Sequence, residues 1–94
     1  MKINLKSNFL LLGDADIDSM EFDSSEITLR ELLDTITRRA TNSPGFLNRD
    51  GTDLNSGWVI EIEGRSFDMC EKGINTMLKD GASVVINIEM LGGG

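Results

Sequence analysis

Four segments of the chain alternate apolar and polar residues with a period of two, the pattern of strands that bury one face. The first is residues 2–6, and the second is residues 19–23, in which Met20 and Phe22 point the same way. A turn-prone Gly-Asp pair separates them, so we expect them to form a hairpin. The apolar cluster at 9–12 is expected to cover one end of the sheet, with a binding patch as the alternative.

The other two alternating segments lie in the second half of the chain. Residues 58–62 alternate before a glycine turn, and the strand is expected to continue toward Phe67. Residues 84–90 alternate again and follow a tight turn at 78–81. The four segments predict a sheet in which the first and last strands pair at the centre.

Between the two pairs of strands, the apolar period changes to that of a helix. Residues 28–31, Thr-Leu-Arg-Glu, match a capping box, in which the Thr28 oxygen accepts the Glu31 N–H and the Glu31 carboxylate reaches back. The helix is expected to end near Arg38 and Arg39, whose charges suit the negative end of the helix dipole. The apolar positions fall on one helix face: Leu29, Leu32, Leu33, Ile36 and Ala40.

Residues 41–57 interrupt the regular pattern. The segment is rich in Asn, Asp, Gly and Ser and holds the only proline, Pro44, so we expect a long surface loop and not a domain boundary. Phe46 and Leu47 are the residues expected to dock the loop on the body. Its role stays open between a functional loop and a disordered one, and a single domain, residues 1–94, is expected.

One helix between two pairs of strands, with the first and last strands adjacent, predicts an α+β fold of the β-grasp type. We expect a mixed sheet of four to five strands with the main helix packed across one face. Met20, Met77 and Met90 stand at positions where core residues are expected.

Composition and charge narrow the functions that such a domain can have. No apolar run approaches the ~20 residues of a membrane span, and the first residues lack the apolar region of a signal peptide. No membrane partner is therefore expected, and the cytoplasm is the expected location. The net charge of -7 disfavours nucleic acid, because such binding uses clustered Lys and Arg, and favours a basic protein partner.

The side chains offer little acid–base or metal chemistry. The sequence has no histidine, the commonest general base and metal ligand, so a metal site and a catalytic triad are poorly supported. Its single cysteine, Cys70, rules out an internal disulfide and is expected to be a half-buried residue without a chemical role.

The last four residues, Leu91-Gly92-Gly93-Gly94, are the most distinctive chemical feature of the sequence. Glycine has no Cβ, so a run of glycines is thin and can thread a narrow channel. Fully extended, residues 91–94 would reach roughly 13 Å beyond the last strand at ~3.3 Å per residue. The sequence therefore predicts a flexible tail that can place the Gly94 carboxylate in the active site of a partner.

Together these features resemble the small sulfur-carrier proteins of the MoaD and ThiS type, which are relatives of ubiquitin by fold. The resemblance covers nearly the whole chain. It is carried by Phe9 after the first strand, by the helix start at 28–33, by the turn at 78–81 with apolar residues following, and by the terminal glycines. Three glycines stand where the family commonly shows two, and the proline often found shortly before them is absent.

The resemblance implies a carrier and not a stand-alone enzyme. An E1-like adenylating enzyme would use ATP to activate the Gly94 carboxylate, and a sulfur donor would convert it to a thiocarboxylate. Gly93 and Gly92 would let the tail enter the partner enzymes, while Leu91 and Met90 would dock at the channel mouth. No cofactor is expected on the chain itself. The sulfur acceptor that the resemblance favours is a molybdopterin synthase large subunit, which acts in molybdenum cofactor biosynthesis.

Three alternatives stay open from the sequence. In the first, the chain is a ubiquitin-like protein modifier, and the activated Gly94 is joined to a lysine amine of a target protein. In the second, the carried sulfur serves thiamine synthesis or another pathway. In the third, the chain is a non-covalent β-grasp adaptor whose tail is idle.

Overall fold

The structure is a computed structural model that describes residues 1–8, 17–40, 45–50, 53–55 and 57–88. Within these residues, strands, one α-helix and two short 3-10 helices follow one another. Their bounds are β1 Lys2–Ser7, β2 Ser19–Glu21, β3 Glu26–Thr28, α1 Leu29–Arg39, β4 Trp58–Ile62, β5 Arg65–Ser66, η1 Phe67–Met69, η2 Gly73–Asn75, β6 Met77–Lys79 and β7 Ser83–Ile88.

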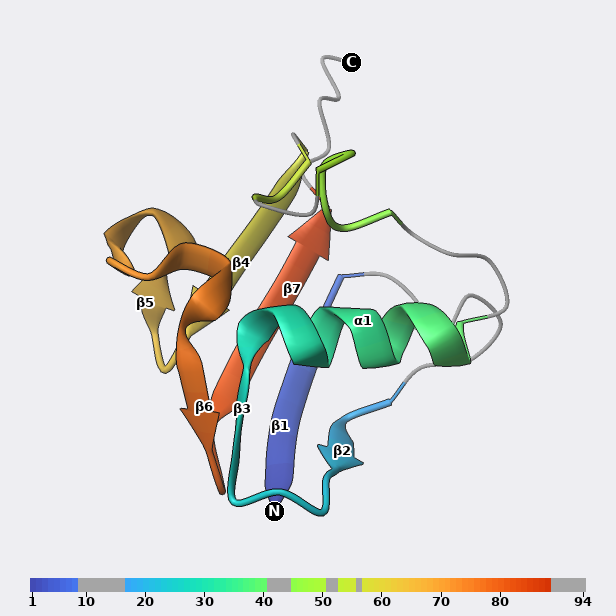
Figure 1. The fold of residues 1–94 in the computed structure, drawn as a ribbon. Helices are drawn as coiled ribbons and strands as arrows, with labels where there is room; N and C mark the ends of the chain where they lie inside the picture. The colour runs from blue at the N-terminus through green and yellow to red at the C-terminus, as the bar shows by residue number, and fades with distance from the viewer. Residues whose placement is uncertain (9–16, 41–44, 51–52, 56, 89–94) are drawn as a thin grey trace.

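Five strands of the described residues form the main sheet in the order β2-β1-β7-β4-β5 (Figure 1). The central strands β1 and β7 run parallel, whereas β1 with β2, β4 with β7 and β4 with β5 are antiparallel. Alternation places Ile3 and Leu5 of β1 on the same buried face as Val84 and Ile86 of β7. The predicted hairpin, the central pairing of the first and last strands and the β-grasp fold are confirmed.

The helix α1 crosses the buried face of this sheet and begins as predicted (Figure 1). The Glu31 N–H donates to Thr28 Oγ1 at 3.2 Å, and the Thr28 N–H donates to the Glu31 carboxylate at 3.4 Å. Ala40, predicted on the apolar stripe, is instead the half-buried C-cap, because its extended backbone with ψ of 141° takes it out of the helix. The other stripe residues are fully buried: Leu29, Leu32, Leu33 and Ile36.

A second, two-stranded sheet was missing from the prediction. β3 and β6 pair antiparallel, with Ile27 opposite Leu78, and both side chains are buried. The segment 78–81, predicted as a tight turn, is therefore part strand, since Leu78 and Lys79 belong to β6 and the chain turns at Gly81, which has φ of +83°. Three-residue strands are too short to show an alternating pattern in the sequence.

The segment after β4 also departs from the prediction. Ile60 and Ile62 are buried as expected, and the chain turns at Glu63 and Gly64, which both have positive φ. After the turn the strand continues as β5 toward Phe67, as predicted, but Phe67 itself begins η1 and does not extend the strand. A local hydrogen bond from the Cys70 N–H to the Phe67 carbonyl at 3.0 Å closes the 3-10 turn instead.

The methionines divide between core and surface. Met20 is buried as predicted, whereas Met77 is 41% exposed, so its predicted core position is wrong. Met77 neighbours Leu78 in β6, and side chains alternate along a strand, so the burial of Leu78 turns Met77 outward. Met90 and the apolar cluster at 9–12 lie outside the described residues.

Candidate functional site

The predicted site residues lie outside the residues that the structure describes: Met90, Leu91, Gly92, Gly93 and Gly94. The structure does describe the place from which the chain continues toward them, the end of β7 at Ile88. We call the residues around this strand end the tail base: Asn8, Trp58, Val59, Asn87 and Ile88.

Asn8 holds the tail base from the β1 side. The ladder between β1 and β7 ends with the pair Ser7 and Ile86. Beyond it, the Ile88 N–H donates to Asn8 Oδ1 at 2.9 Å, and Asn8 Nδ2 donates to the Ile88 carbonyl at 3.0 Å. One amide side chain thus supplies the acceptor and the donor that a strand backbone would supply. The last described residue before the tail is fixed by a partner 80 positions away.

Replacing Asn8 with alanine is expected to loosen the tail base without unfolding the protein. Both hydrogen bonds to Ile88 disappear, and each contributes ~0.5–1.5 kcal/mol, so the Ile88 amide should exchange with solvent about tenfold faster or more. Amide exchange followed by NMR measures this, with the Ile86 amide as internal reference. The variant Asn8→Asp keeps the acceptor and should retain part of the protection, and an unchanged Ile88 exchange rate in Asn8→Ala would contradict this account.

The described part of the 41–57 loop, whose role stays open from the sequence, packs beside the tail base (Figure 1). The Phe46 side chain is 1% exposed, and its ring centroid lies 4.5 Å from that of Trp58. Trp58 Nε1 donates to the Gly45 carbonyl at 3.3 Å. Because Trp58 is also the register partner of Ile88, one side chain joins the loop to the end of the tail strand.

The described part of the loop has structure of its own. Leu47 and Leu54 form an antiparallel bridge, and the Asn55 N–H donates to the Phe46 carbonyl at 2.8 Å. The Asn55 side chain donates to the carbonyls of Gly45 at 2.7 Å and Leu47 at 2.8 Å. The predicted docking through Phe46 is confirmed, and the half-buried Leu47 also packs against the core.

The sheet face opposite α1 is mostly polar but carries an exposed apolar residue in the tail base. Register aligns Lys6, Val85 and Glu61 across β1, β7 and β4, so opposite charges flank a half-buried valine. Nearer the strand end, Val59 is 42% exposed, and Ile88 on the helix side is 37% exposed.

Three further observations concern Cys70, metal binding and membrane spans. Cys70 is half-buried as expected, and its Sγ donates to the Ser66 carbonyl at 3.6 Å. Among the described residues, no three His, Cys, Asp or Glu side chains stand close enough to hold a metal ion together. The one α-helix in this part of the chain lacks the length and apolar character of a membrane span.

Comparison with known proteins gives likenesses of structure. No protein-family model matches the sequence, and no curated protein matches it. The HVO 2177 protein of Haloferax volcanii, solved in solution, has a TM-score of 0.74 at 19% identity, covering 98% of this chain and 86% of its own.

Two crystal structures are similar over nearly their whole length. SAMP1 of Haloferax volcanii has a TM-score of 0.69 at 12% identity, covering 98% of this chain and 99% of its own. Urm1 of Sulfolobus solfataricus has a TM-score of 0.59 at 23% identity, covering 94% and 99%. At these identities the likeness shows the β-grasp fold, and it agrees with the resemblance of the sequence to MoaD-type and ThiS-type proteins.

Proposed function

We propose that the chain is a sulfur carrier whose mature form ends at Gly94, and that this terminal carboxylate is activated and converted to a thiocarboxylate. One observation carries the proposal: the central strand β7, held at Ile88, leads within a few residues into Leu91-Gly92-Gly93-Gly94. The likeness to SAMP1 and Urm1 supports the general class of ubiquitin-like carriers and modifiers.

The tail base gives this arm a fixed origin. Asn8 holds the Ile88 backbone on one side, and β4 pairs with β7 on the other. Residues 89–94, fully extended, span roughly 20 Å at ~3.3 Å per residue. A fixed origin and a thin arm together place the Gly94 carboxylate deep in a partner while the folded body stays outside. Gly92 and Gly93 present no side chain to the walls of such a channel.

The proposed chemistry is supplied by the partner enzyme. A carboxylate is a poor electrophile, because its charge is delocalised and it has no good leaving group. An oxygen of the Gly94 carboxylate attacks the α-phosphorus of ATP, and pyrophosphate leaves. A hydrosulfide or persulfide sulfur then attacks the carbonyl carbon, and AMP leaves with the electron pair of the broken C–O bond. When the donor is a persulfide, a thiol reduces the remaining S–S bond and releases the thiocarboxylate.

The partners follow from this chemistry. We propose an E1-like adenylating enzyme as activator and a molybdopterin synthase large subunit as acceptor, because the helix start and the glycine tail look most like MoaD-type chains. The chain itself is then a carrier subunit, not an enzyme, and binds no cofactor. Its need for ATP makes the cytoplasm the compartment that we propose.

Exchange of labelled pyrophosphate into ATP tests the activation step. The E1-like enzyme of the native host, mixed with the chain, is expected to catalyse exchange, because adenylate formation is reversible. The same enzyme without the chain is the control. Absence of exchange above this control with every E1-like enzyme of the host would contradict the proposal. Exchange followed by isopeptide conjugates and no thiocarboxylate would instead show the protein modifier, which uses the same tail.

A further inference from the structure

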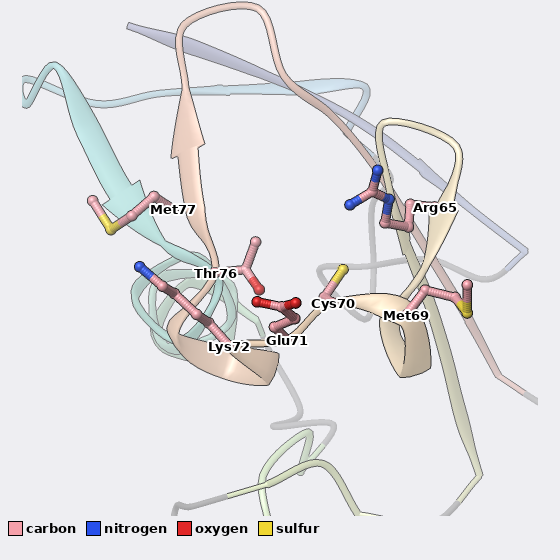
Figure 2. Close-up of a pocket in the computed structure, with 7 residues that line it drawn as sticks. All are labelled: Arg65, Met69, Cys70, Glu71, Lys72, Thr76 and Met77. Atoms are coloured by element: carbon pink, nitrogen blue, oxygen red, sulfur yellow. The ribbon is translucent and has the colours of Figure 1, made fainter.

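A pocket of about 410 Å³ lies away from the tail base, beside η1, η2 and the start of β6 (Figure 2). It adjoins β5, which pairs with the end of β4 opposite to Trp58. We call it the methionine pocket, and its lining consists of Arg65, Met69, Cys70, Glu71, Lys72, Thr76 and Met77.

Two exposed methionines stand on opposite sides of this pocket. Met69 is 70% exposed and Met77 is 41% exposed, and neither belongs to the core. Figure 2 shows Met69 on the side of Arg65, and Met77 on the side of Lys72. Methionine is unbranched and polarizable, so it adapts to apolar groups of varied shape. The sides of the pocket therefore suit an apolar side chain of a partner.

Two cationic side chains accompany the methionines. Arg65 and Lys72 are exposed, and neither side chain forms an ion pair or hydrogen bond within the described part of the chain. They stand out in a sequence with 9 Lys and Arg against 16 Asp and Glu. Glu71 lies between them in Figure 2. The cations at the two sides fit carboxylates, and the acidic centre disfavours a third one.

The hydrogen-bond donors of Thr76 and Cys70 in the pocket are already used within the chain. Thr76 Oγ1 donates to the Gly73 carbonyl at 2.6 Å, and Cys70 Sγ donates to the Ser66 carbonyl. Both donors are thus engaged within the chain. The two methionines, the two cations and Glu71 are therefore the groups that can select a ligand.

We propose that the methionine pocket binds an extended segment of a partner protein in which an apolar residue has acidic residues two positions before and two positions after it, so that all three side chains share one face. The apolar residue packs between Met69 and Met77, and the carboxylates lie near Arg65 and Lys72. The net charge of -7 favours a basic partner for the chain as a whole, but Arg65 and Lys72 make this pocket an exception. A nucleic acid fits less well, because two cations beside an acidic centre do not follow a phosphate backbone. Since the pocket is remote from the tail base, a partner can hold the folded body while the tail is engaged elsewhere.

Titration with two synthetic peptides tests the pocket. The first is acetylated and amidated Asp-Gly-Leu-Gly-Asp, in which both Asp side chains lie on the face of Leu when the peptide is extended, and the second replaces both Asp with Asn. Amide chemical shifts recorded by NMR at low salt are expected to change within residues 65–77, with weaker binding of the Asn peptide. Each of Arg65→Ala and Lys72→Ala should weaken binding of the first peptide about two- to fivefold, the range of an exposed ion pair. Added salt should remove the difference in affinity between these variants and the unchanged chain.

Further variants test whether peptide binding depends on the pocket itself, on charge elsewhere in the chain or on the tail. Met69→Ala should weaken the binding of both peptides. Lys6 is a cation outside the pocket, so Lys6→Ala should leave binding unchanged. Deletion of Gly94 should also leave it unchanged, so failure here and failure of the carrier proposal are distinguishable. Equal binding of the two peptides, or shifts spread outside residues 65–77, would overturn the proposal. Concentration-dependent shifts at 65–77 without peptide would also overturn it, in favour of a second copy of this chain as the occupant.

Discussion

Deletion of Gly94 is expected to abolish activation of the chain while the folded domain unfolds at the same denaturant concentration as before. The change withdraws the terminal carboxylate by ~3.3 Å. A displacement of ~1 Å of a reacting group already costs about 100-fold in rate, so a loss of at least that size is expected. Every described core residue precedes Ile88, so stability should be unaffected. Pyrophosphate exchange measures the activation, and urea unfolding measures the stability.

A substitution in the tail distinguishes the effect of tail length on activation from the effect of tail width. Gly93→Phe keeps the carboxylate at the same number of residues from β7 but adds a ring where we propose a narrow channel. Its activation should fall as far as that of the Gly94 deletion. Gly93→Ala is the matched control and should lose less activity than the phenylalanine variant. Full activation of both the deletion and Gly93→Phe would show that the tail is idle, as in an adaptor.

Truncation of Leu33 to alanine is expected to destabilise the fold by about 2–5 kcal/mol. Leu33 is 0% exposed on the face of α1 that covers the sheet, so the change leaves a cavity in the centre of the core. Urea unfolding followed by circular dichroism gives the free energy. Arg30→Ala, on the exposed side of the same helix, should change it by less than about 0.5 kcal/mol. A loss below about 1 kcal/mol for Leu33→Ala would mean that this face is packed differently.

The longest elements of the fold are those that the sequence predicted. β1, β4 and β7 each carry enough alternating residues to define a buried face, and α1 combines a capping box with an apolar stripe. These signals are local, because they depend on neighbours in the sequence and on no distant contact. They were sufficient for the β-grasp fold, since its centre is the pairing of β1 with β7.

The strands that escaped prediction depend on contacts with a distant part of the chain, whereas the 3-10 turns lack a sequence pattern of their own. β3 and β6 are each three residues long and exist as strands because they pair with each other. The same pairing orients Leu78 inward and leaves Met77 exposed, which reversed its expected burial. The 3-10 turns η1 and η2 are held by hydrogen bonds between close neighbours and carry no apolar period.

The candidate site divides in the same way. The glycine tail is visible in the sequence because its composition alone sets it apart. The sequence does not reveal the role of Asn8, because asparagine is common after a strand and its partner Ile88 is 80 residues away. The loop beside the tail base is a related case: Phe46 was recognisable as an anchor, but only the structure places it against Trp58.

The intact mass of the chain from its native cells tests the central claim most directly. The chain is measured before and after incubation of the cell extract with ATP and a sulfur donor, and a Gly94 deletion expressed in the same host is the control. We predict a mass that ends the chain at Gly94 and a gain equal to the replacement of one oxygen by sulfur, absent from the deletion. If the chain has the mass of an ordinary carboxylate both before and after the incubation, with or without heavier protein conjugates, the result would contradict the sulfur carrier.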